Sequence, residues 1–318
     1  MKMIDIHTHV GDLIYGQPLD EAYEEPVWTP VAFMEWNGFR TNQPPPGLRT
    51  LSRYLEIIHI HHRNNLATEK NLRRFAARAG VTHAVLQPIE PLRRTEDNLV
   101  LCAAASERAK GKASPAPAGT DGGAIQIFTF ASVDPRDPDR LRKLERYMAA
   151  GCLGLKLHPI VQNLPLTDPA WFEMVEALSP YRKPVLIHSG QATYYIPHFR
   201  RTAYGDARTF TKLIAAFPEQ PFILAHHNLG EPEVVWALAK QYANVYADSS
   251  FQPAAVIRRA FSEMGEDRVL YASDFPFTLP YYAVKVGMQA TKGNDKRREK
   301  FFCHNAESLI GRLPEAIP

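Results

Sequence analysis

Two histidines close the first strand-like run of the chain, in the segment Asp5-Ile6-His7-Thr8-His9. Side chains alternate across a strand, so His7 and His9 project from the same face, about 6–7 Å apart along the backbone. Two imidazoles placed in this way can share one divalent metal ion if further ligands come from elsewhere in the chain. A His-x-His pair alone is more often a pair of core or surface histidines, so later residues have to decide.

Three further residues with metal-binding side chains follow directly on strand-like runs: His188, His226 and Asp274. An aspartate in such a position is costly to bury unless it is paired or bound to a metal. In a parallel α/β barrel the carboxyl ends of the strands meet at one face, where active sites form. Together with His7 and His9, these residues therefore predict a metal site.

The elements that must position these residues are eight runs of strand character, at 3–6, 81–87, 125–133, 152–157, 184–188, 221–226, 244–248 and 268–273. Helical signals separate most of them, and four helices are expected at 137–150, 169–179, 206–217 and 231–243. Strand followed by helix along the whole chain predicts an α/β fold of the (β/α)8 TIM-barrel type. An open, doubly wound sheet would have similar apolar strands, so this pattern alone does not decide.

The chain of 318 residues is expected to form a single domain, residues 1–318, because α/β barrels routinely exceed about 250 residues as one unit. Residues 12–68 form a long insertion after the first strand, rich in aromatic residues and proline. Loops that follow barrel strands build the active site, so this insertion is a candidate lid or substrate wall. A second break, at 111–124, is rich in Gly, Ala, Pro and Ser.

The order of these motifs resembles the amidohydrolase superfamily, and within it the amidohydrolase-related branch that includes the aminocarboxymuconate-semialdehyde decarboxylase-like enzymes. The resemblance spans the whole chain and rests on five segments, at 5–9, 186–188, 224–226, 273–277 and 303–311. The first four are similar to the family's opening His-x-His, its histidines after strands five and six, and its closing Ser-Asp-x-Pro motif. The fifth is similar to the helix that ends many members, where its role is packing.

The resemblance implies one divalent ion held by His7, His9, His188 and Asp274, with His226 opposite as an acid/base or oxyanion-stabilising group. Asp274 would bind the metal and also exchange a proton with bound water. Three imidazoles and one carboxylate leave the site net positive, which lowers the pKa of bound water towards about 7. Zinc is the first expectation for this ligand set, although manganese or iron would also suit it.

Lys156 and His158 share a face at the end of the fourth strand-like run. Binuclear members of the superfamily carry a carbamylated lysine there, which bridges two metal ions. In the branch that this chain resembles, the position binds or orients the substrate instead. Lys156 and His158 are therefore expected to contact the substrate beside a single metal ion.

The loop after the fifth strand-like run carries aromatic and basic side chains, among them Tyr194 and Arg200. This loop adjoins His188, so both residues are expected to bind substrate. An arginine in that place could hold a carboxylate through two parallel hydrogen bonds, although a solvated arginine is the more common outcome.

The resemblance leaves two reactions open for one site. In the first, metal-activated water hydrolyses a C–N or C–O bond of an amide, lactone or ester, and this is the main expectation. In the second, an aromatic or unsaturated carboxylic acid loses CO2 without hydrolysis, and a histidine or Asp274 delivers the replacing proton. A third class, the phosphoesterases that also open with His-x-His, usually ends in Asp-x-His, whereas Phe275 and Pro276 follow Asp274 here.

The composition indicates that the main partner is a small-molecule substrate. Lys and Arg number 37 against 34 Asp and Glu, too even a balance to indicate nucleic acid or an anionic membrane as the main partner. No apolar stretch approaches the roughly 18 residues of a membrane span. Three widely spaced cysteines predict neither disulfides nor a thiolate zinc site, and a cytoplasmic location is expected. The aromatic insertion is as consistent with a homodimer contact as with a lid.

Overall fold

The structure is a computed structural model of the chain, and it describes residues 1–23, 60–109, 125–191 and 201–314. Within these residues lie eight short strands: β1 (Ile4–Thr8), β2 (His83–Leu86), β3 (Gln126–Thr129), β4 (Leu155–Leu157), β5 (Val185–Ile187), β6 (Phe222–Leu224), β7 (Val245–Asp248) and β8 (Val269–Leu270). Each falls inside or beside a run that the sequence predicts as strand. The last is shorter than predicted, because the backbone N–H of Tyr271 donates to the carbonyl of Phe301 rather than to a neighbouring strand.

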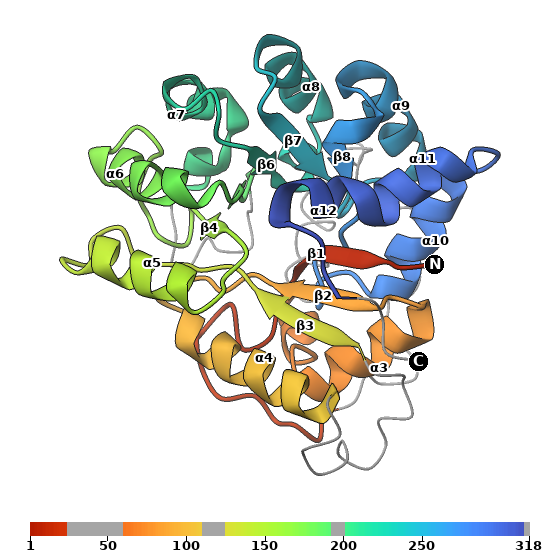
Figure 1. Ribbon diagram of the computed structural model, residues 1–318, viewed down its shortest axis with the longest axis horizontal. Helices are drawn as coiled ribbons and strands as arrows, with labels where there is room; N and C mark the ends of the chain where they lie inside the picture. Colours follow the sequence, from red (N-terminus) through yellow and green to blue (C-terminus); the bar gives the residue numbers. More distant parts are fainter. Residues whose placement is uncertain (24–59, 110–124, 192–200, 315–318) are drawn as a thin grey trace, which may run out of the picture.

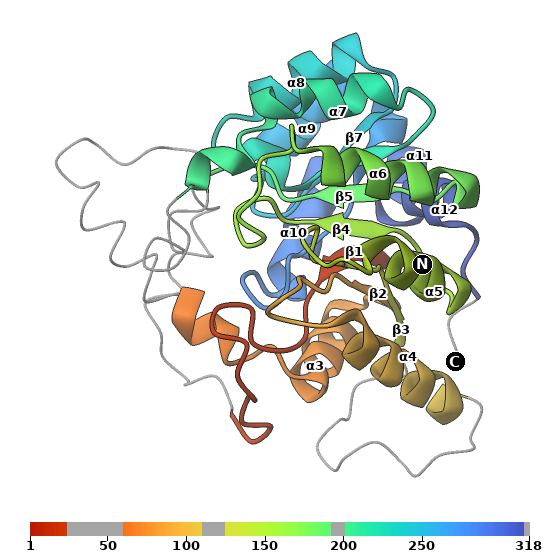
Figure 2. The same cartoon turned by 90° about the vertical axis from the view of Figure 1, so that its left-hand side faces the viewer.

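The strands are parallel and follow one another in chain order around a barrel. Hydrogen bonds join β1, β2 and β3 into one sheet and β4 to β8 into another. Two parallel bridges connect the sheets, from Ala131 to Leu155 and from Thr8 to Phe275. Figure 1 shows the strands ringed by helices, and Figure 2 shows the same strands from the side, between helices. The fold is a TIM barrel, as the sequence predicts.

The described part of the chain includes the helices α3 (Glu69–Ala79), α4 (Thr95–Ala109), α5 (Arg140–Ala149), α6 (Pro169–Leu178), α7 (Thr211–Ala216), α8 (Pro232–Gln241), α9 (Ala254–Met264), α10 (Pro280–Ala290), α11 (Asp295–Glu299) and α12 (Asn305–Ile310). Asp168 caps α6, with its side chain accepting a hydrogen bond from the backbone N–H of Ala170. The helix predicted at 206–217 begins later, because Asp206 caps a 3₁₀ turn over residues 207–210 before α7 starts. No helix in the described part of the chain is both long and apolar enough to cross a bilayer.

Alternating side chains of each strand supply two separate cores. In β5, Val185 and Ile187 pack into the outer cluster beneath the helices, whereas Leu186 packs into the inner cluster within the barrel. Ile223 of β6 joins Leu186 inside. Apolar residues therefore occupy both faces of a strand, as expected for a parallel sheet that is buried on both sides.

The C-terminal helix α12 closes one end of the barrel, and Figure 1 shows it lying across the strands. Ala306, Leu309 and Ile310 pack against Ile4 and Ile6 of β1 in the inner cluster. The segment at 303–311 is therefore a packing element, as the resemblance implied. This arrangement leaves the opposite end of the barrel, at the carboxyl ends of the strands, for a site.

A bulge in β1 changes which of its side chains face inward. Asp5 lies opposite Ala84 and Thr8 lies opposite Leu86, so β1 advances by three residues where β2 advances by two. An extra residue of this kind re-aims the side chains that follow it. The two histidines at the end of β1 consequently face the barrel interior, whereas Asp5 shares the outward face of its partner Ala84.

The described ends of the insertion are tied to each other by two tyrosine–histidine pairs. The hydroxyl of Tyr15 lies 3.0 Å from Nδ1 of His61, and that of Tyr23 lies 2.7 Å from Nδ1 of His62. The return segment is helical over residues 60–64. Residues 24–59 of the predicted lid, and the whole segment at 111–124, lie outside the described residues.

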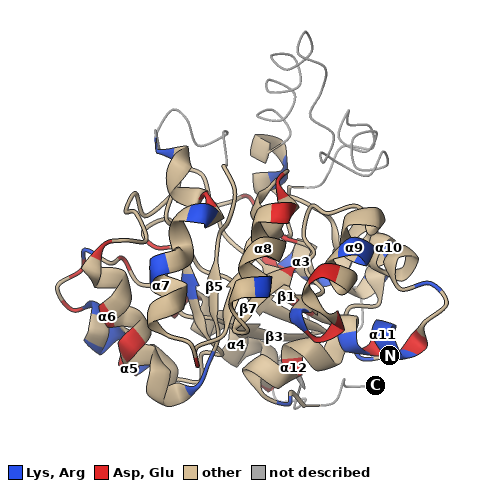
Figure 3. Cartoon of the chain, turned by 90° about the horizontal axis from the view of Figure 1, so that it is seen from above, with Lys and Arg blue, Asp and Glu red and all other residues tan. Residues whose placement is uncertain are grey.

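Charged residues of both signs are interspersed along the helices, as Figure 3 shows. Several form ion pairs between neighbouring elements, such as Arg208 with Glu231 and Lys240 with Glu263. Exposed pairs of this kind contribute little to stability. A cluster of buried titratable side chains lies at the carboxyl ends of the strands, where the candidate site is found.

Candidate metal centre

All five residues that the sequence places at the ends of strands as site candidates are buried at one end of the barrel. His7 and His9 come from β1, His188 follows β5, His226 follows β6 and Asp274 lies shortly after β8. Each has a relative exposure of 3% or less. Polar groups buried so completely have to bind one another or a ligand.

His7, His9 and Asp274 form the closest part of the group. Oδ1 of Asp274 lies 2.9 Å from Nε2 of His9 and 3.3 Å from Nε2 of His7. The rings of the two histidines are 5.0 Å apart between centroids. The common face predicted for these histidines is therefore confirmed, and both rings present the same nitrogen to one carboxylate oxygen.

The other nitrogens of these two rings are already held by acceptors. Nδ1 of His7 lies 2.8 Å from Oδ2 of Asp248, and Nδ1 of His9 lies 2.6 Å from the backbone carbonyl of Gln87. A carbonyl or carboxylate oxygen accepts, so each ring donates its proton through Nδ1. The Nε2 lone pairs of His7 and His9 therefore both face Asp274.

His188 lies at a different side of the group, between His158 and His226. Its ring stacks on that of His158 at 4.1 Å with an interplanar angle of 7°, and lies 5.0 Å from that of His226. Nε2 of His188 is buried without a hydrogen-bond partner among the described residues. An orphaned imidazole nitrogen in a polar cluster is a free ligand position.

His226, which the resemblance places opposite the metal ligands as an acid/base group, lies close to His7 and Asp274. One ligand atom each of His226, His7 and Asp274 lie within 4.8 Å of one another. The rings of His226 and His7 stack at 5.1 Å. His226 can therefore serve either as a ligand or as an acid/base group beside the metal, and the two roles make different predictions.

Lys156 extends from β4 into the same group. Its Nζ lies 3.0 Å from Nε2 of His7, and the side chain is buried. Burial lowers the pKa of Lys156 to about 8, while Asp274 and Asp248 oppose this shift. The predicted substrate residues Lys156 and His158 are thus both in the cluster, whereas Tyr194 and Arg200 lie outside the described residues.

Burial also controls the protonation of the histidines. It lowers the pKa of His9 and of His188 to about 3 in each case, with Lys156 adding to both shifts. Burial likewise holds the pKa of His7 well below its usual range. For Asp274, burial raises the pKa well above the usual value, and nearby Lys156 opposes this effect. The imidazoles are therefore neutral at pH 7, which is the form that binds metal.

The donor set fits a divalent metal ion. Lone pairs on Nε2 of His7 and His9 converge on Asp274, and the nearby His188 offers a nitrogen that has no other partner among the described residues. Three neutral imidazoles and one carboxylate are a common ligand set for zinc or manganese. Carbonyl and carboxylate groups behind the rings orient them, as in known metal sites.

Two ligand-bearing segments adopt left-handed backbone conformations. Asp274 has a φ of 57°, and His226 to Leu229 all have positive φ values, with 59° at His226. Such conformations are uncommon for residues other than glycine and gather at functional sites. Hydrogen bonds stabilise them here: the N–H of Asp274 donates to the carbonyl of His7 at 2.8 Å, and that of His226 to Oδ1 of Asp248 at 3.0 Å.

Comparison with protein-family models shows which family this chain belongs to. The family model described as "Amidohydrolase" matches residues 4–312, nearly the whole chain. The chain belongs to the amidohydrolase family. It is an enzyme of the amidohydrolase superfamily, as the motif order predicted, and its barrel carries the candidate ligands at the expected strand ends. No curated protein matches the chain.

Solved structures similar to this amidohydrolase confirm the fold. A 2,6-dihydroxybenzoate decarboxylase from Rhizobium has a TM-score of 0.61 and 16% identity, with 98% of each chain covered. An uncharacterized TIM-barrel protein from Bordetella bronchiseptica has a TM-score of 0.66 and 14% identity, with 98% of this chain and 100% of that chain covered. A dihydroxybenzoic acid decarboxylase from Polaromonas, solved with manganese and 2-nitroresorcinol, has a TM-score of 0.59 and 17% identity, with 98% of each chain covered.

Asp248 and Ser250 are members of this amidohydrolase's polar cluster that the sequence reasoning missed. Asp248 ends β7 with no exposed surface and contacts both His7 and the backbone of His226. Nδ1 of His226 lies 2.6 Å from the hydroxyl of Ser250. A signal was present, because Asp248 ends a predicted strand as Asp274 does, and the same argument about buried carboxylates applies to it.

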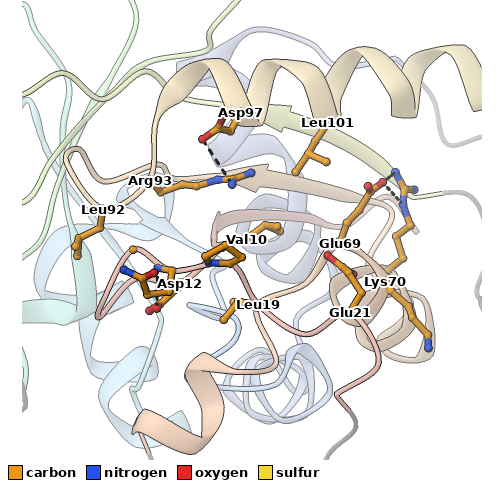
Figure 4. Close-up of a pocket in the computed structure, with 16 residues that line it drawn as sticks. Val10, Asp12, Leu19, Glu21, Glu69, Lys70, Leu92, Arg93, Asp97 and Leu101 are labelled. Atoms are coloured by element: carbon orange, nitrogen blue, oxygen red, sulfur yellow. Dashed lines mark hydrogen bonds and ion pairs between the residues drawn. The ribbon is translucent and has the colours of Figure 1, made fainter.

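A separate hollow of about 660 Å³ opens beside the loop after β1 (Figure 4). The described residues that line it include Val10, Asp12, Arg93 and Asp97, and none of the candidate ligands. Arg93 pairs with Asp97 at 3.7 Å, so the charge in this hollow is partly satisfied within the chain. The candidate ligands therefore lie in the buried cluster and not in this hollow.

Proposed function

We propose that this amidohydrolase is a metal-dependent decarboxylase of an aromatic carboxylic acid. The observation that carries the proposal is the position of the candidate ligands beside aromatic rings, with Phe251 5.2 Å from the ring of His226 and Phe277 6.3 Å from the ring of His9. Asp274, whose Oδ1 lies 2.9 Å from Nε2 of His9, is the carboxyl group placed to deliver a proton to carbon. Hydrolysis would instead require a group that accepts a proton from water at this place.

In this proposal His7, His9, His188 and Asp274 hold one divalent ion. When bound, that ion supplies a Lewis acid for the carboxylate and neighbouring oxygens of the substrate. Manganese is the first ion to test, because a structure similar to this one contains it. Zinc, expected from the ligand types, remains the second candidate.

The walls of the site suit an aromatic acid. Phe251 lies 5.2 Å from the ring of His226, and Phe277 lies 6.3 Å from the ring of His9. These rings offer apolar contact to an aromatic substrate. Lys156 brings a buried amine within reach of the substrate's carboxylate, and His158 extends the polar wall beside His188.

The reaction breaks the bond between the ring carbon and the carboxylate carbon and puts a proton in place of CO2. Asp274 supplies the proton to the ring carbon, and the electron pair of the broken bond restores the aromatic system as CO2 leaves. Nδ1 of His226 is engaged by Ser250, so Nε2 is left to accept a hydrogen bond from a ring hydroxyl of the substrate. The proton on Asp274 is replaced from water before the next turnover.

Hydrolysis of an amide, lactone or ester was the main expectation from the sequence, and the same ligands would serve it. The aromatic walls favour decarboxylation instead. The similar structures from Rhizobium and Polaromonas are both decarboxylases of dihydroxybenzoic acids, which adds support from proteins of the same fold.

A substrate screen tests the proposal. Protein loaded with Mn²⁺ or Zn²⁺ is incubated with hydroxybenzoic acids, including 2,6-dihydroxybenzoate, and separately with lactones, esters and amides. We expect CO2 and the decarboxylated phenol from at least one acid, and no product after chelation of the metal. Hydrolysis of a lactone, ester or amide by the same loaded protein, without CO2 from any acid, would contradict it.

We further propose that residues 1–318 work as one catalytic unit on a small-molecule substrate. The strands that carry the candidate ligands extend from β1 to β8, and the family match runs over residues 4–312. Removing either end of the chain would therefore remove a ligand or α12, which packs against β1.

A further inference from the structure

We propose that Asp248 is a positioning residue that sets the tautomer of two histidines, His7 directly and His226 through Ser250. The inference rests on the proposed function only for the roles of these histidines, as metal ligand and as hydrogen-bonding group for the substrate. The contacts themselves are properties of the chain. Each oxygen of one carboxylate serves a different ring.

The first oxygen of Asp248 controls His7. Oδ2 lies 2.8 Å from Nδ1 of His7, and both side chains are buried. A carboxylate only accepts hydrogen bonds, so the ring of His7 donates its proton through Nδ1. Nε2 then keeps its lone pair and faces Asp274, which is the arrangement that metal binding requires.

The second oxygen controls His226 through a chain of two hydrogen bonds. Oδ1 accepts the backbone N–H of His226 at 3.0 Å, the backbone N–H of Ser250 at 3.1 Å and the hydroxyl of Ser250. The one hydroxyl proton of Ser250 is thus directed to Asp248. Its oxygen must accept from Nδ1 of His226, 2.6 Å away. His226 therefore also carries its proton on Nδ1.

The two rings are held by this carboxylate as a stacked pair. They are 5.1 Å apart with an interplanar angle of 27°, although they come from β1 and from the turn after β6. The backbone of His226 is left-handed, with a φ of 59°, and its N–H is fixed by Asp248. Asp248 consequently anchors a strained turn as well as a ring.

This arrangement separates two functions that share one carboxylate. Ser250 contacts His226 but not His7, so its hydroxyl is expected to affect His226 alone. Asp248 contacts both histidines, so its charge is expected to affect metal binding as well. Variants at the two positions should therefore have different effects.

Asp248→Asn tests the contact of Asp248 with His7, and the measurement is the affinity for Zn²⁺ in competition with a chelator. The amide oxygen of the substituted side chain can keep the backbone N–H groups, which turns its NH2 group towards Nδ1 of His7. The ring must then carry its proton on Nε2 and loses the lone pair that faces the metal. We expect Zn²⁺ affinity to fall about 10- to 100-fold.

Ser250→Ala tests the hydrogen-bond chain from Asp248 through Ser250 to His226. Ser249→Ala is the matched control, and Ser250→Thr is the conservative variant. Ser249 lies next in sequence but bonds to the backbone of Ala272 rather than to a histidine. We expect Ser250→Ala to keep Zn²⁺ affinity within about twofold, since the contact of Asp248 with His7 is intact. Its ¹⁵N NMR spectrum should show that His226 no longer holds the Nδ1–H tautomer, which Ser250→Thr should restore.

Three results would overturn the inference: wild-type protein with His226 protonated at Nε2, Asp248→Asn with wild-type Zn²⁺ affinity, or Ser250→Ala weakening Zn²⁺ as much as Asp248→Asn does. If Asp248→Asn does not fold, the spectra of wild type, Ser250→Ala and Ser249→Ala decide alone. None of these measurements uses turnover. An enzyme that fails to release CO2 would therefore refute the proposed function and leave this inference standing.

Discussion

The amine of Lys156 lies 3.0 Å from Nε2 of His7, the nitrogen that the proposed metal ion needs. One lone pair cannot serve an ammonium proton and a metal ion at once. Nearby, Oδ1 of Asp274 lies 2.9 Å from Nε2 of His9 in the same way. In the metal-free protein, an amine and a carboxyl group thus occupy the nitrogens that metal binding would take over.

Replacing Lys156 should strengthen metal binding at neutral pH. Its pKa is lowered to about 8, so at pH 7 only about a tenth of the chains carry the neutral amine that leaves His7 free. Wild-type affinity for Mn²⁺ should therefore rise about tenfold from pH 7 to pH 9. Lys156→Met should bind at pH 7 as tightly as wild type does at pH 9, measured by titration calorimetry, and exposed Lys212→Met should behave like wild type.

The same variant tests the number of metal ions. We expect one ion per chain in wild type and one in Lys156→Met, measured by elemental analysis of purified protein. Two ions in wild type and fewer in Lys156→Met would show that a carbamylated Lys156 bridges a binuclear site, contrary to the proposal.

His226→Ala should keep the fold and the metal but lose most turnover, by about 10²- to 10⁴-fold. The substitution removes the imidazole that is proposed to accept a hydrogen bond from the substrate. Neighbouring His227→Leu is the matched control, since His227 is buried and both of its ring nitrogens lack partners among the described residues. Metal content and activity are measured in the same samples. Loss of metal together with activity in His226→Ala alone would identify His226 as a ligand, a role that its distance to His7 and Asp274 also allows.

Asp5 should make the stability of the protein depend on pH. Burial raises its pKa from 3.8 to about 7, so between these values the folded chain holds a proton that the unfolded chain releases. The free energy of unfolding should fall as pH rises through this window, by at most about 1.4 kcal/mol per pH unit, and level off above pH 7.

Asp5→Asn removes this contribution because the amide does not titrate. Urea unfolding at pH 5, 6, 7 and 8 should show the variant gaining stability relative to wild type as pH rises. Exposed Asp20→Asn serves as the control for the loss of one charge. Parallel pH profiles for wild type and Asp5→Asn would show that Asp5 is ionised in the folded protein.

The sequence could predict the barrel and the candidate ligands because both depend on local pattern. Runs such as Val185–Ile187 are apolar on both faces, and a histidine or aspartate directly after such a run lies at the carboxyl end of a barrel strand. Neither prediction requires knowing which residues far apart in the sequence are in contact.

Other features depend on contacts that sequence spacing does not encode. The bulge in β1 arises from its register with β2, about 80 residues away, and it places the side chain of Asp5 on the other face of the strand from the ring of His7. The left-handed turn at His226 is stabilised by Asp248 from the next strand. Pairing between Asp248 and His7 joins residues 241 positions apart.

The most direct test of the account measures CO2 and metal together in wild type and Asp274→Asn. Asp274 is proposed both to bind the metal and to give a proton to carbon, and an amide cannot give that proton. Wild-type protein loaded with Mn²⁺, supplied in D2O with the acid that the screen identifies, should release one CO2 per product and leave one deuterium on the ring carbon. Asp274→Asn should remain folded, hold metal more weakly, and lose activity by orders of magnitude at every pH even at saturating Mn²⁺. Near-normal CO2 release by Asp274→Asn, with its metal content checked in the same sample, would contradict the account.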